Sequence, residues 1–130
     1  MDSKSTIMVV DDDDQVRHTL CENLEECGFE VLQARDGQEA MNHLDEGKQP
    51  LVVITDLIMP RKEGLEVILE IRKLHPGIRL IAMSGGGRSK AADFLQMAAR
   101  LGADAIMPKP IDIAELEKTV RDLMEAEPLV

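Results

Sequence analysis

The sequence predicts one α/β domain, in which a doubly wound, five-stranded parallel sheet carries helices on both faces. Its 130 residues suit a single globular domain, and 44% of them are hydrophobic, which is enough for a substantial core. Short apolar segments of strand length alternate with segments of helical periodicity, and only a few residues connect them. Because parallel strands need crossover connections that lay a helix against the sheet, this alternation predicts helices on both sides.

Five short apolar runs mark the expected strands. The run at 29–34 alternates apolar and polar residues more than the others do, which is typical of an edge strand. The expected strands cover residues 7–10, 29–34, 51–54, 78–83 and 103–107.

A segment with apolar residues at every third or fourth position follows each expected strand. The predicted helices lie near residues 16–27, 36–46, 65–74, 94–101 and 116–123. In the third of them, the repeating face consists of Leu65, Ile68, Leu69 and Arg72, widened by Ile71 and Leu74. The glycines that would stop helices at their carboxyl ends are Gly28, Gly47, Gly77 and Gly102.

The charge of the chain limits its partners. Its 15 basic and 25 acidic residues give a net charge of −10, which disfavours binding to DNA, to RNA and to anionic membranes. No apolar run approaches the length of a transmembrane helix, and the first residues contain no hydrophobic signal core. We therefore expect a cytoplasmic protein whose partners are proteins.

The chain contains two cysteines, Cys21 and Cys27, six residues apart in a predicted helix. At this spacing their side chains point in different directions, and the spacing differs from the C-x-x-C pattern of redox and metal sites. We expect both to be reduced thiols in the core.

Acidic residues stand at the carboxyl ends of two expected strands. Asp11 to Asp14 follow the first strand, and Asp56 follows the third. Ligands of open α/β sheets bind at this edge, so Asp11, Asp12 and Asp56 would share a pocket if the two strands are neighbours. Three carboxylates so close together favour a hard divalent cation such as Mg²⁺, whereas Asp13 and Asp14 are more typical of a solvated helix N-terminus.

Two more polar residues end strands. Ser84 closes the fourth apolar run and Lys109 closes the fifth. Together with the acids and a cation, a hydroxyl and an ammonium at one sheet edge would complement a phosphoryl group. The glycines at 85–87 do not follow the pattern of a nucleotide-binding P-loop, and we interpret residues 85–88 as a loop that moves when the site is filled.

Four segments in register resemble the receiver domain of two-component response regulators. They are Val9-Val10-Asp11-Asp12, Asp56-Leu57-Ile58-Met59-Pro60, Ser84-Gly85, and Gly102-Ala103-Asp104 through Lys109-Pro110. The resemblance covers essentially the whole chain. It implies a flavodoxin-like (βα)5 fold with strand order 2-1-3-4-5.

The resemblance also implies roles for individual residues. Asp56 would accept a phosphoryl group from a phosphohistidine on a sensor histidine kinase or a histidine phosphotransfer protein. Asp11, Asp12, Asp56 and the backbone carbonyl of Ile58 would hold Mg²⁺, for which Mn²⁺ could substitute. Lys109 would pair with the phosphoryl group, Ser84 would be the switch hydroxyl, and the bond from Lys109 to Pro110 would be cis.

The sequence departs from the family pattern at positions that affect the switch. Ile106 stands where this family usually has an aromatic residue, so no ring can swing inward. We therefore expect output to depend on residues 85–88, Gly85 and Gly86 included, and on the face formed by the fourth helix, fifth strand and fifth helix, which could also form a homodimer. Ile58 and Gly86 cannot orient an attacking water, which predicts slow self-dephosphorylation.

The resemblance implies a signalling domain that catalyses only its own phosphorylation and slow dephosphorylation. Residues 1–130, with a core of about 5–126, are expected to form one stand-alone receiver domain without an output domain, signalling to a downstream protein and not to DNA. Two alternatives stay open at this point. One is a haloacid-dehalogenase-type phosphohydrolase with Asp11 as nucleophile, and the other is a receiver-like scaffold that works without phosphorylation.

Overall fold

Helices and strands alternate along the chain in a computed structural model that describes residues 5–57, 64–85 and 96–125. The elements are β1 (Thr6–Val10), α1 (Asp14–Glu26), β2 (Glu30–Ala34), α2 (Gly37–Asp45), β3 (Val52–Asp56), α3 (Gly64–Leu74), β4 (Arg79–Ser84), β5 (Ala105–Pro108) and α5 (Ile113–Glu125). Residues 96–101 are also helical, within the predicted fourth helix. Gly86 and Ile58, named above for the switch and for the metal site, lie outside the described residues.

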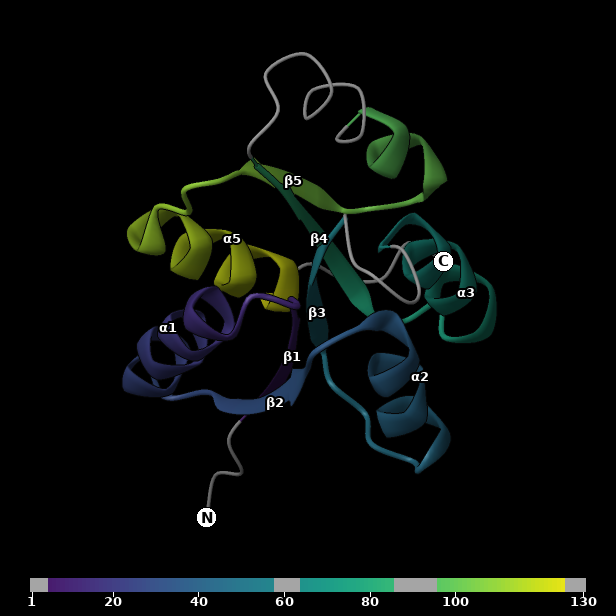
Figure 1. The fold of residues 1–130 in the computed structure, drawn as a ribbon, viewed down its shortest axis with the longest axis horizontal. Helices are drawn as coiled ribbons and strands as arrows, with labels where there is room; N and C mark the ends of the chain where they lie inside the picture. The colour runs from purple at the N-terminus through teal and green to yellow at the C-terminus, as the bar shows by residue number, and fades with distance from the viewer. Residues whose placement is uncertain (1–4, 58–63, 86–95, 126–130) are drawn as a thin grey trace.

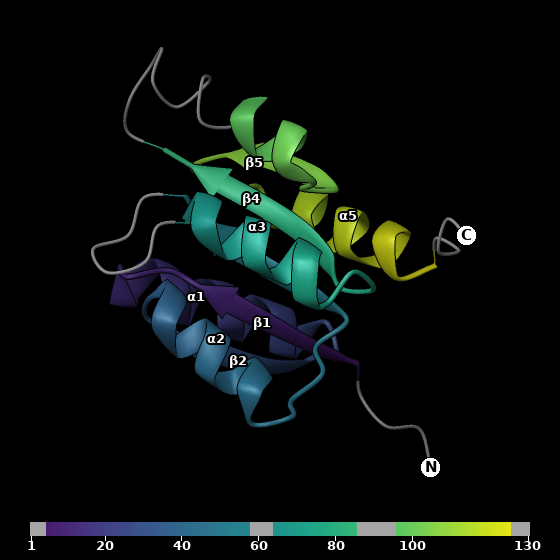
Figure 2. The ribbon, with the colours of Figure 1, turned by 90° about the vertical axis from the view of Figure 1, so that its right-hand side faces the viewer.

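All strand pairs are parallel, and the sheet has the order β2-β1-β3-β4-β5. The predicted fold class and strand order are therefore confirmed, with the alternating strand β2 at one edge. In Figure 1, α1 and α5 lie on one side of the sheet, and α2 and α3 lie on the other. Figure 2 shows α2 and α3 against the same face.

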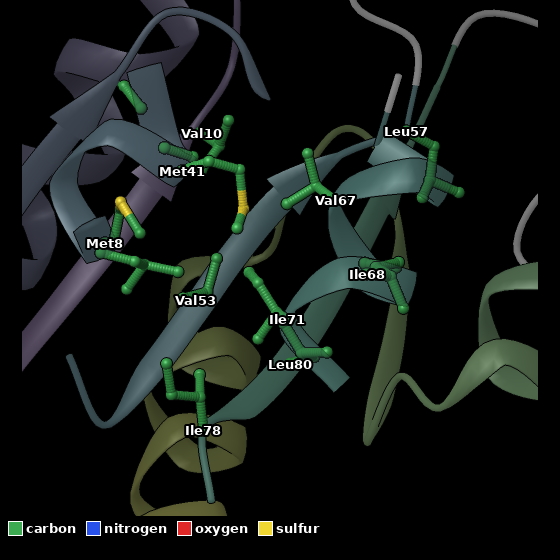
Figure 3. Packing of buried hydrophobic residues seen from close by; sticks show 14 of the residues in the cluster. Met8, Val10, Met41, Val53, Leu57, Val67, Ile68, Ile71, Ile78 and Leu80 are labelled. Carbon is green, nitrogen blue, oxygen red and sulfur yellow. The ribbon is translucent and has the colours of Figure 1, made fainter. Parts of the chain in front are cut away.

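The two faces of the sheet carry separate cores, as the two-residue period of a strand requires. In β1, Met8 and Val10 pack with α2 and α3, whereas Ile7 and Val9 pack with α1 and α5. Figure 3 shows the first cluster, with side chains from β1, β3 and β4 meeting Met41 of α2 and Ile71 of α3. Burial of these apolar side chains is the main contribution to stability, and it fixes which strand ends meet at the edge of the sheet.

The predicted face of α3 is wrong in part. Gly64, Val67, Ile68 and Ile71 are its buried residues, at helical spacing, whereas Leu69 is exposed. Leu69 directly follows Ile68 and is therefore turned by about 100° around the helix axis. Leu74, at the end of the helix, is also exposed.

Three other expectations need correction. The third strand extends through Asp56, so this residue ends the strand and does not follow it. Gly28, Gly47 and Gly102 have the positive φ of helix stops, but Gly77 does not and lies in a turn after Pro76. Cys21 is buried, and burial raises the pKa of its thiol to about 11, but Cys27 at the end of α1 is only half-buried.

No helix in the described ranges is both long enough and apolar enough to cross a membrane.

Candidate functional site

The carboxyl ends of β1 and β3 bring the predicted acidic residues together. These strands are neighbours with Val10 opposite Thr55, so Asp11, just after β1, lies next to Asp56, the last residue of β3. Carboxylate oxygens of Asp11, Asp12 and Asp56 all lie within 4.8 Å of one another. Asp11 and Asp56 are buried and Asp12 is exposed, so the cluster has a closed base and one open side.

Lys109 reaches this cluster from the connection after β5. Its Nζ lies 2.8 Å from Asp11 Oδ2 and 3.3 Å from Asp56 Oδ1. Its backbone amide donates to the Ser84 carbonyl at 2.8 Å, which fixes the start of the side chain beside β4. Gly85 makes room for it, because a Cβ at this position would lie 2.6 Å from Lys109 Cβ. This gives Gly85 a steric role beside the site.

Within the part of the chain that the structure describes, the site holds more negative charge than Lys109 alone can balance. Burial raises the pKa of the Asp56 carboxyl from 3.8 to about 6, and the charge of Asp11 adds to the rise while Lys109 opposes it. Burial alone would lower the pKa of Lys109, but its hydrogen bond to Asp11 and the charge of Asp56 outweigh burial and raise it. Lys109 therefore stays protonated, and among residues 5–57, 64–85 and 96–125 it is the one ammonium paired with these carboxylates.

The donor set of this cluster fits a hard divalent cation. Three carboxylates with one open side are the ligands that Mg²⁺ and Mn²⁺ prefer, because these ions bind oxygen and keep some of their water. The cluster contains no thiolate or imidazole, which zinc would favour.

Ser84 places a buried hydroxyl at the same edge. It ends β4, which pairs with β3 so that Asp56 lies opposite Met83, the residue before Ser84. Ser84 is 1% exposed, and its Oγ has no hydrogen-bond partner among the residues that the structure describes. Since nearly all buried hydroxyls are paired, this oxygen is suited to a ligand that enters the pocket.

Asp13 and Asp14 belong to the start of α1, as expected. Asp13 is the N-cap residue, and its side chain accepts from the amides of Gln15 and Val16. Its own amide donates to Asp11 Oδ1 at 2.9 Å, so the cap also orients a carboxylate of the cluster.

Ile106 is an exposed residue of β5, opposite Ala82 of β4. It is 42% exposed, and its neighbour Met107 belongs to the core on the α1 and α5 side of the sheet. The bond between Lys109 and Pro110 is cis, as predicted.

Two residues beside the cluster were not predicted. Gly64 packs so closely on the Asp56 carbonyl that a Cβ there would overlap this oxygen. Arg17 is a buried cation that donates to the Asp11 carbonyl. Both act on backbone atoms, and no side-chain pattern in the sequence signals such contacts.

An apolar groove of about 560 Å³ opens next to Lys109. It lies between the first half of α1 and the connection from β5 to α5. The lining residues are Gln15, Val16, Thr19, Leu20, Lys109, Pro110, Ile111 and Ile113.

Curated relatives match nearly the whole of this chain. The chain is 31% identical to the sensor kinase CckA of Brucella abortus over 128 residues, which cover 98% of this chain and 13% of that protein. It is 36% identical to the transcriptional regulatory protein CpxR of Klebsiella pneumoniae over 120 residues, which cover 91% of this chain and 48% of CpxR. The chain thus spans less than half the length of these relatives.

Two solved structures are similar over nearly their whole length. A CheY-like receiver domain protein from Methanospirillum hungatei has a TM-score of 0.84 and 27% identity, covering 95% of each chain. A receiver domain protein from Clostridium thermocellum has a TM-score of 0.85 and 29% identity, covering 92% of this chain and 94% of that one.

Most of the sequence matches a known protein family. Residues 7–121 match the family described as the response regulator receiver domain. This match does not favour the phosphohydrolase or the phosphorylation-independent scaffold. From the order of its strands, the acids at their ends and these similarities together, the chain belongs to the receiver domain family of two-component response regulators.

Proposed function

We propose that Asp56 is the phosphoryl acceptor of this receiver domain. The supporting observation is the convergence of three kinds of group at one sheet edge: a buried carboxylate, an ammonium 3.3 Å from it and a buried hydroxyl at the end of the adjacent strand. Asp56 suits a nucleophile because Lys109 holds it and because it lies at the base of a pocket with an open side. Asp11 is a poorer candidate, since Asp13 and Lys109 already occupy its two oxygens.

Asp11, Asp12 and Asp56 would hold Mg²⁺ or Mn²⁺, and the Ile58 carbonyl is proposed as a further ligand from the family resemblance. When bound, the cation supplies positive charge that offsets the repulsion between the carboxylates and the incoming phosphoryl oxygens.

The residues of the chain divide the transfer between them. An Asp56 oxygen attacks the phosphorus of a phosphohistidine, so that a P–O bond forms while the P–N bond breaks. The imidazole leaves with the bonding electrons and takes a proton from water. Lys109 stabilises one phosphoryl oxygen electrostatically, and the Ser84 hydroxyl donates a hydrogen bond to another.

The phosphoryl donor is proposed to be a sensor histidine kinase or a histidine phosphotransfer protein. A donor that reaches Asp56 through the open side would lie against the groove beside Lys109, which offers apolar surface from Val16 and Ile111. The net charge of −10 supports a protein partner better than DNA.

Phosphorylation would act as a switch between two states of the domain. The new phosphoryl oxygens would give the Ser84 hydroxyl a partner and Lys109 an additional one in one state only, and this differential contact shifts the equilibrium. We propose that residues 5–126 form the switching unit. A downstream protein, or a second copy of the chain, would bind the face that includes β5 and α5. Because Ile58 and Gly86 have no side chain that could orient water, hydrolysis of the aspartyl phosphate should be slow.

The experiment is to incubate the protein with acetyl phosphate, with and without Mg²⁺, and to map the modified peptide by mass spectrometry. We expect one phosphoryl group on Asp56, dependent on Mg²⁺ and absent from Asp56→Asn. The matched control is Asp45→Asn, which changes an exposed carboxylate at the end of α2 and should be labelled normally.

Normal labelling of Asp56→Asn would contradict the proposal. Label on Asp11 with continuous turnover of acetyl phosphate would instead support a phosphohydrolase. No label under any condition would support the scaffold.

A further inference from the structure

Arg17 is the one Lys or Arg that is fully buried among residues 5–57, 64–85 and 96–125, with 5% of its surface exposed. It lies in the first turn of α1, and its side chain reaches the backbone of Asp11 in the acidic cluster. Burying a guanidinium lowers the stability of the fold unless its N–H groups find hydrogen-bond acceptors. The acceptors of Arg17 therefore show which parts of the chain it holds in place.

The guanidinium donates in three directions. Nε donates to Gln33 Oε1 in β2 at 3.0 Å, Nη1 to the Asp11 carbonyl at 2.9 Å and Nη2 to Asp14 Oδ1 at 2.6 Å. The three acceptors belong to the neighbouring edge strand, to the loop after β1 and to α1. Because the fork is planar and rigid, holding two of these acceptors fixes the direction in which the third must lie.

The contact with Asp11 completes a set that immobilises this residue. Its amide donates to the Ala34 carbonyl at 3.1 Å, its Oδ1 accepts from the Asp13 amide, and its Oδ2 accepts from Lys109. The Asp11 carbonyl is part of the peptide unit that leads to Asp12. Fixing that oxygen sets the plane of the unit, and with it the position from which the exposed Asp12 side chain starts.

The charge of Arg17 is balanced locally. Its ion pair is with Asp14, outside the cluster, and its contact with Asp11 is to a neutral carbonyl and not to the carboxylate. The shape of the guanidinium therefore matters more to the cluster than its charge does. A lysine would keep the charge but, as a compact group on a flexible stem, would not span the three acceptors.

We propose that Arg17 is a positioning residue that presets the peptide unit between Asp11 and Asp12, so that the acidic cluster has its cation-binding geometry before the cation arrives. The inference rests on the proposed function, since it concerns the same cluster. Arg17 has no role in the chemistry itself.

The test measures the affinity for Mg²⁺ alone, without a phosphoryl donor, by isothermal titration calorimetry. We compare wild type with Arg17→Lys and Arg17→Met at a temperature where circular dichroism shows each of them folded. Both variants should bind Mg²⁺ about 10-fold more weakly, as is typical when a group that orients a ligand is removed. Arg35→Met is the matched control, because the exposed Arg35 side chain pairs with Glu39 on the surface, and this variant should bind Mg²⁺ as wild type does.

Gln33→Leu is a second variant that leaves Arg17 in place and removes one acceptor. We expect a loss of about 2-fold to 5-fold, the equivalent of one hydrogen bond. Adding Gln33→Leu to Arg17→Lys should cause little further loss, because the two substitutions break one contact. If the Arg17 variants do not fold, the test depends on Gln33→Leu alone. A Mg²⁺ affinity equal to that of wild type in Gln33→Leu would then overturn the inference.

Other outcomes separate the inference from the function on which it rests. Affinities within about 2-fold of wild type in both Arg17 variants would overturn the inference. Wild-type affinity in Arg17→Lys with a loss only in Arg17→Met would also overturn it, because charge and not shape would then be sufficient. Failure of the wild type itself to bind Mg²⁺ would instead contradict the proposed function.

Discussion

The two ends of the sheet contrast in how their polar groups are paired. At the amino end, Arg72 of α3 donates to the carbonyls of Gly102, Pro76 and Ile78 and pairs with Asp104 at 2.9 Å. Asp104 in turn accepts from the Leu80 amide at the start of β4. At the carboxyl end, three carboxylates share one lysine, and the Ser84 hydroxyl has no partner within the described residues.

The polar groups at the amino end stabilise the fold, whereas those at the carboxyl end are suited to bind a ligand. Arg72 joins α3, β4 and the segment before β5, and each of its three guanidinium nitrogens donates to an acceptor of the fold. As far as the described residues show, the carboxyl end keeps a surplus of negative charge and an unpaired hydroxyl, and both cost stability in the isolated protein. Substitution of a paired polar group should therefore lower the free energy of unfolding, and substitution of an unbalanced group at the carboxyl end should raise it.

The largest expected effect is at the amino end. Arg72→Met should lower the free energy of unfolding by about 3 kcal/mol, because it removes the donor to the carbonyls of Gly102, Pro76 and Ile78 and leaves the Asp104 carboxylate without its cation. Urea denaturation followed by circular dichroism measures this, since the chain has no Trp or Tyr for fluorescence. The control Arg35→Met, which removes only an exposed ion pair, should change it by no more than about 0.5 kcal/mol. Equal stability of the two variants would show that Arg72 does not hold this end together.

A substitution at the carboxyl end should have the opposite sign. Without divalent cations at neutral pH, Asp56→Asn should raise the free energy of unfolding by about 2 kcal/mol, because it removes a buried charge next to Asp11. Asp104→Asn is the matched control and should lower it by about 1 kcal/mol, because the charge in that case is paired with Arg72. Destabilisation by both substitutions would mean that the negative charge of the acidic cluster is already offset in the protein without a cation.

The smallest expected effect compares two buried hydroxyls. Ser84→Ala should raise the free energy of unfolding by about 1 kcal/mol, because it removes a polar atom without a partner. Thr55→Val should lower it by about 1 kcal/mol, because Thr55 Oγ1 donates to the Asp56 carbonyl at 2.9 Å. The same urea titrations measure both. A loss of stability in Ser84→Ala would show that its hydroxyl is already paired in the folded protein.

The residue pattern was sufficient to predict the fold class, because parallel strands buried on both faces and helices with one apolar stripe have different periods. The strand order came from the family resemblance. The cluster of Asp11, Asp12 and Asp56 was predicted on the condition that the first and third strands are neighbours, and the pairing of β1 with β3 meets that condition. Leu69 was wrongly assigned to the buried face of α3. A shift of one residue turns a side chain by about 100° around the helix axis, which is enough to move it from the core to the solvent.

The remaining residues could not be predicted for a different reason. Arg17, Gly64 and Arg72 all contact backbone carbonyls, those of Asp11, Asp56 and Gly102. Arg72 even fell on the apolar period of its helix, which suggested burial but not what the guanidinium would bind. A carbonyl is present at every residue, so its partner becomes visible only when the chain is folded.

The central claim is that the carboxyl end of the sheet is completed by a divalent cation, and calorimetric titration with Mg²⁺ tests it most directly. The account predicts one site in the wild type, at least about 10-fold weaker binding in Asp12→Asn and unchanged binding in Asp104→Asn. Asp12 is exposed, so its substitution should leave the fold intact. No uptake by the wild type, or equal affinity in wild type and Asp12→Asn, would contradict the account.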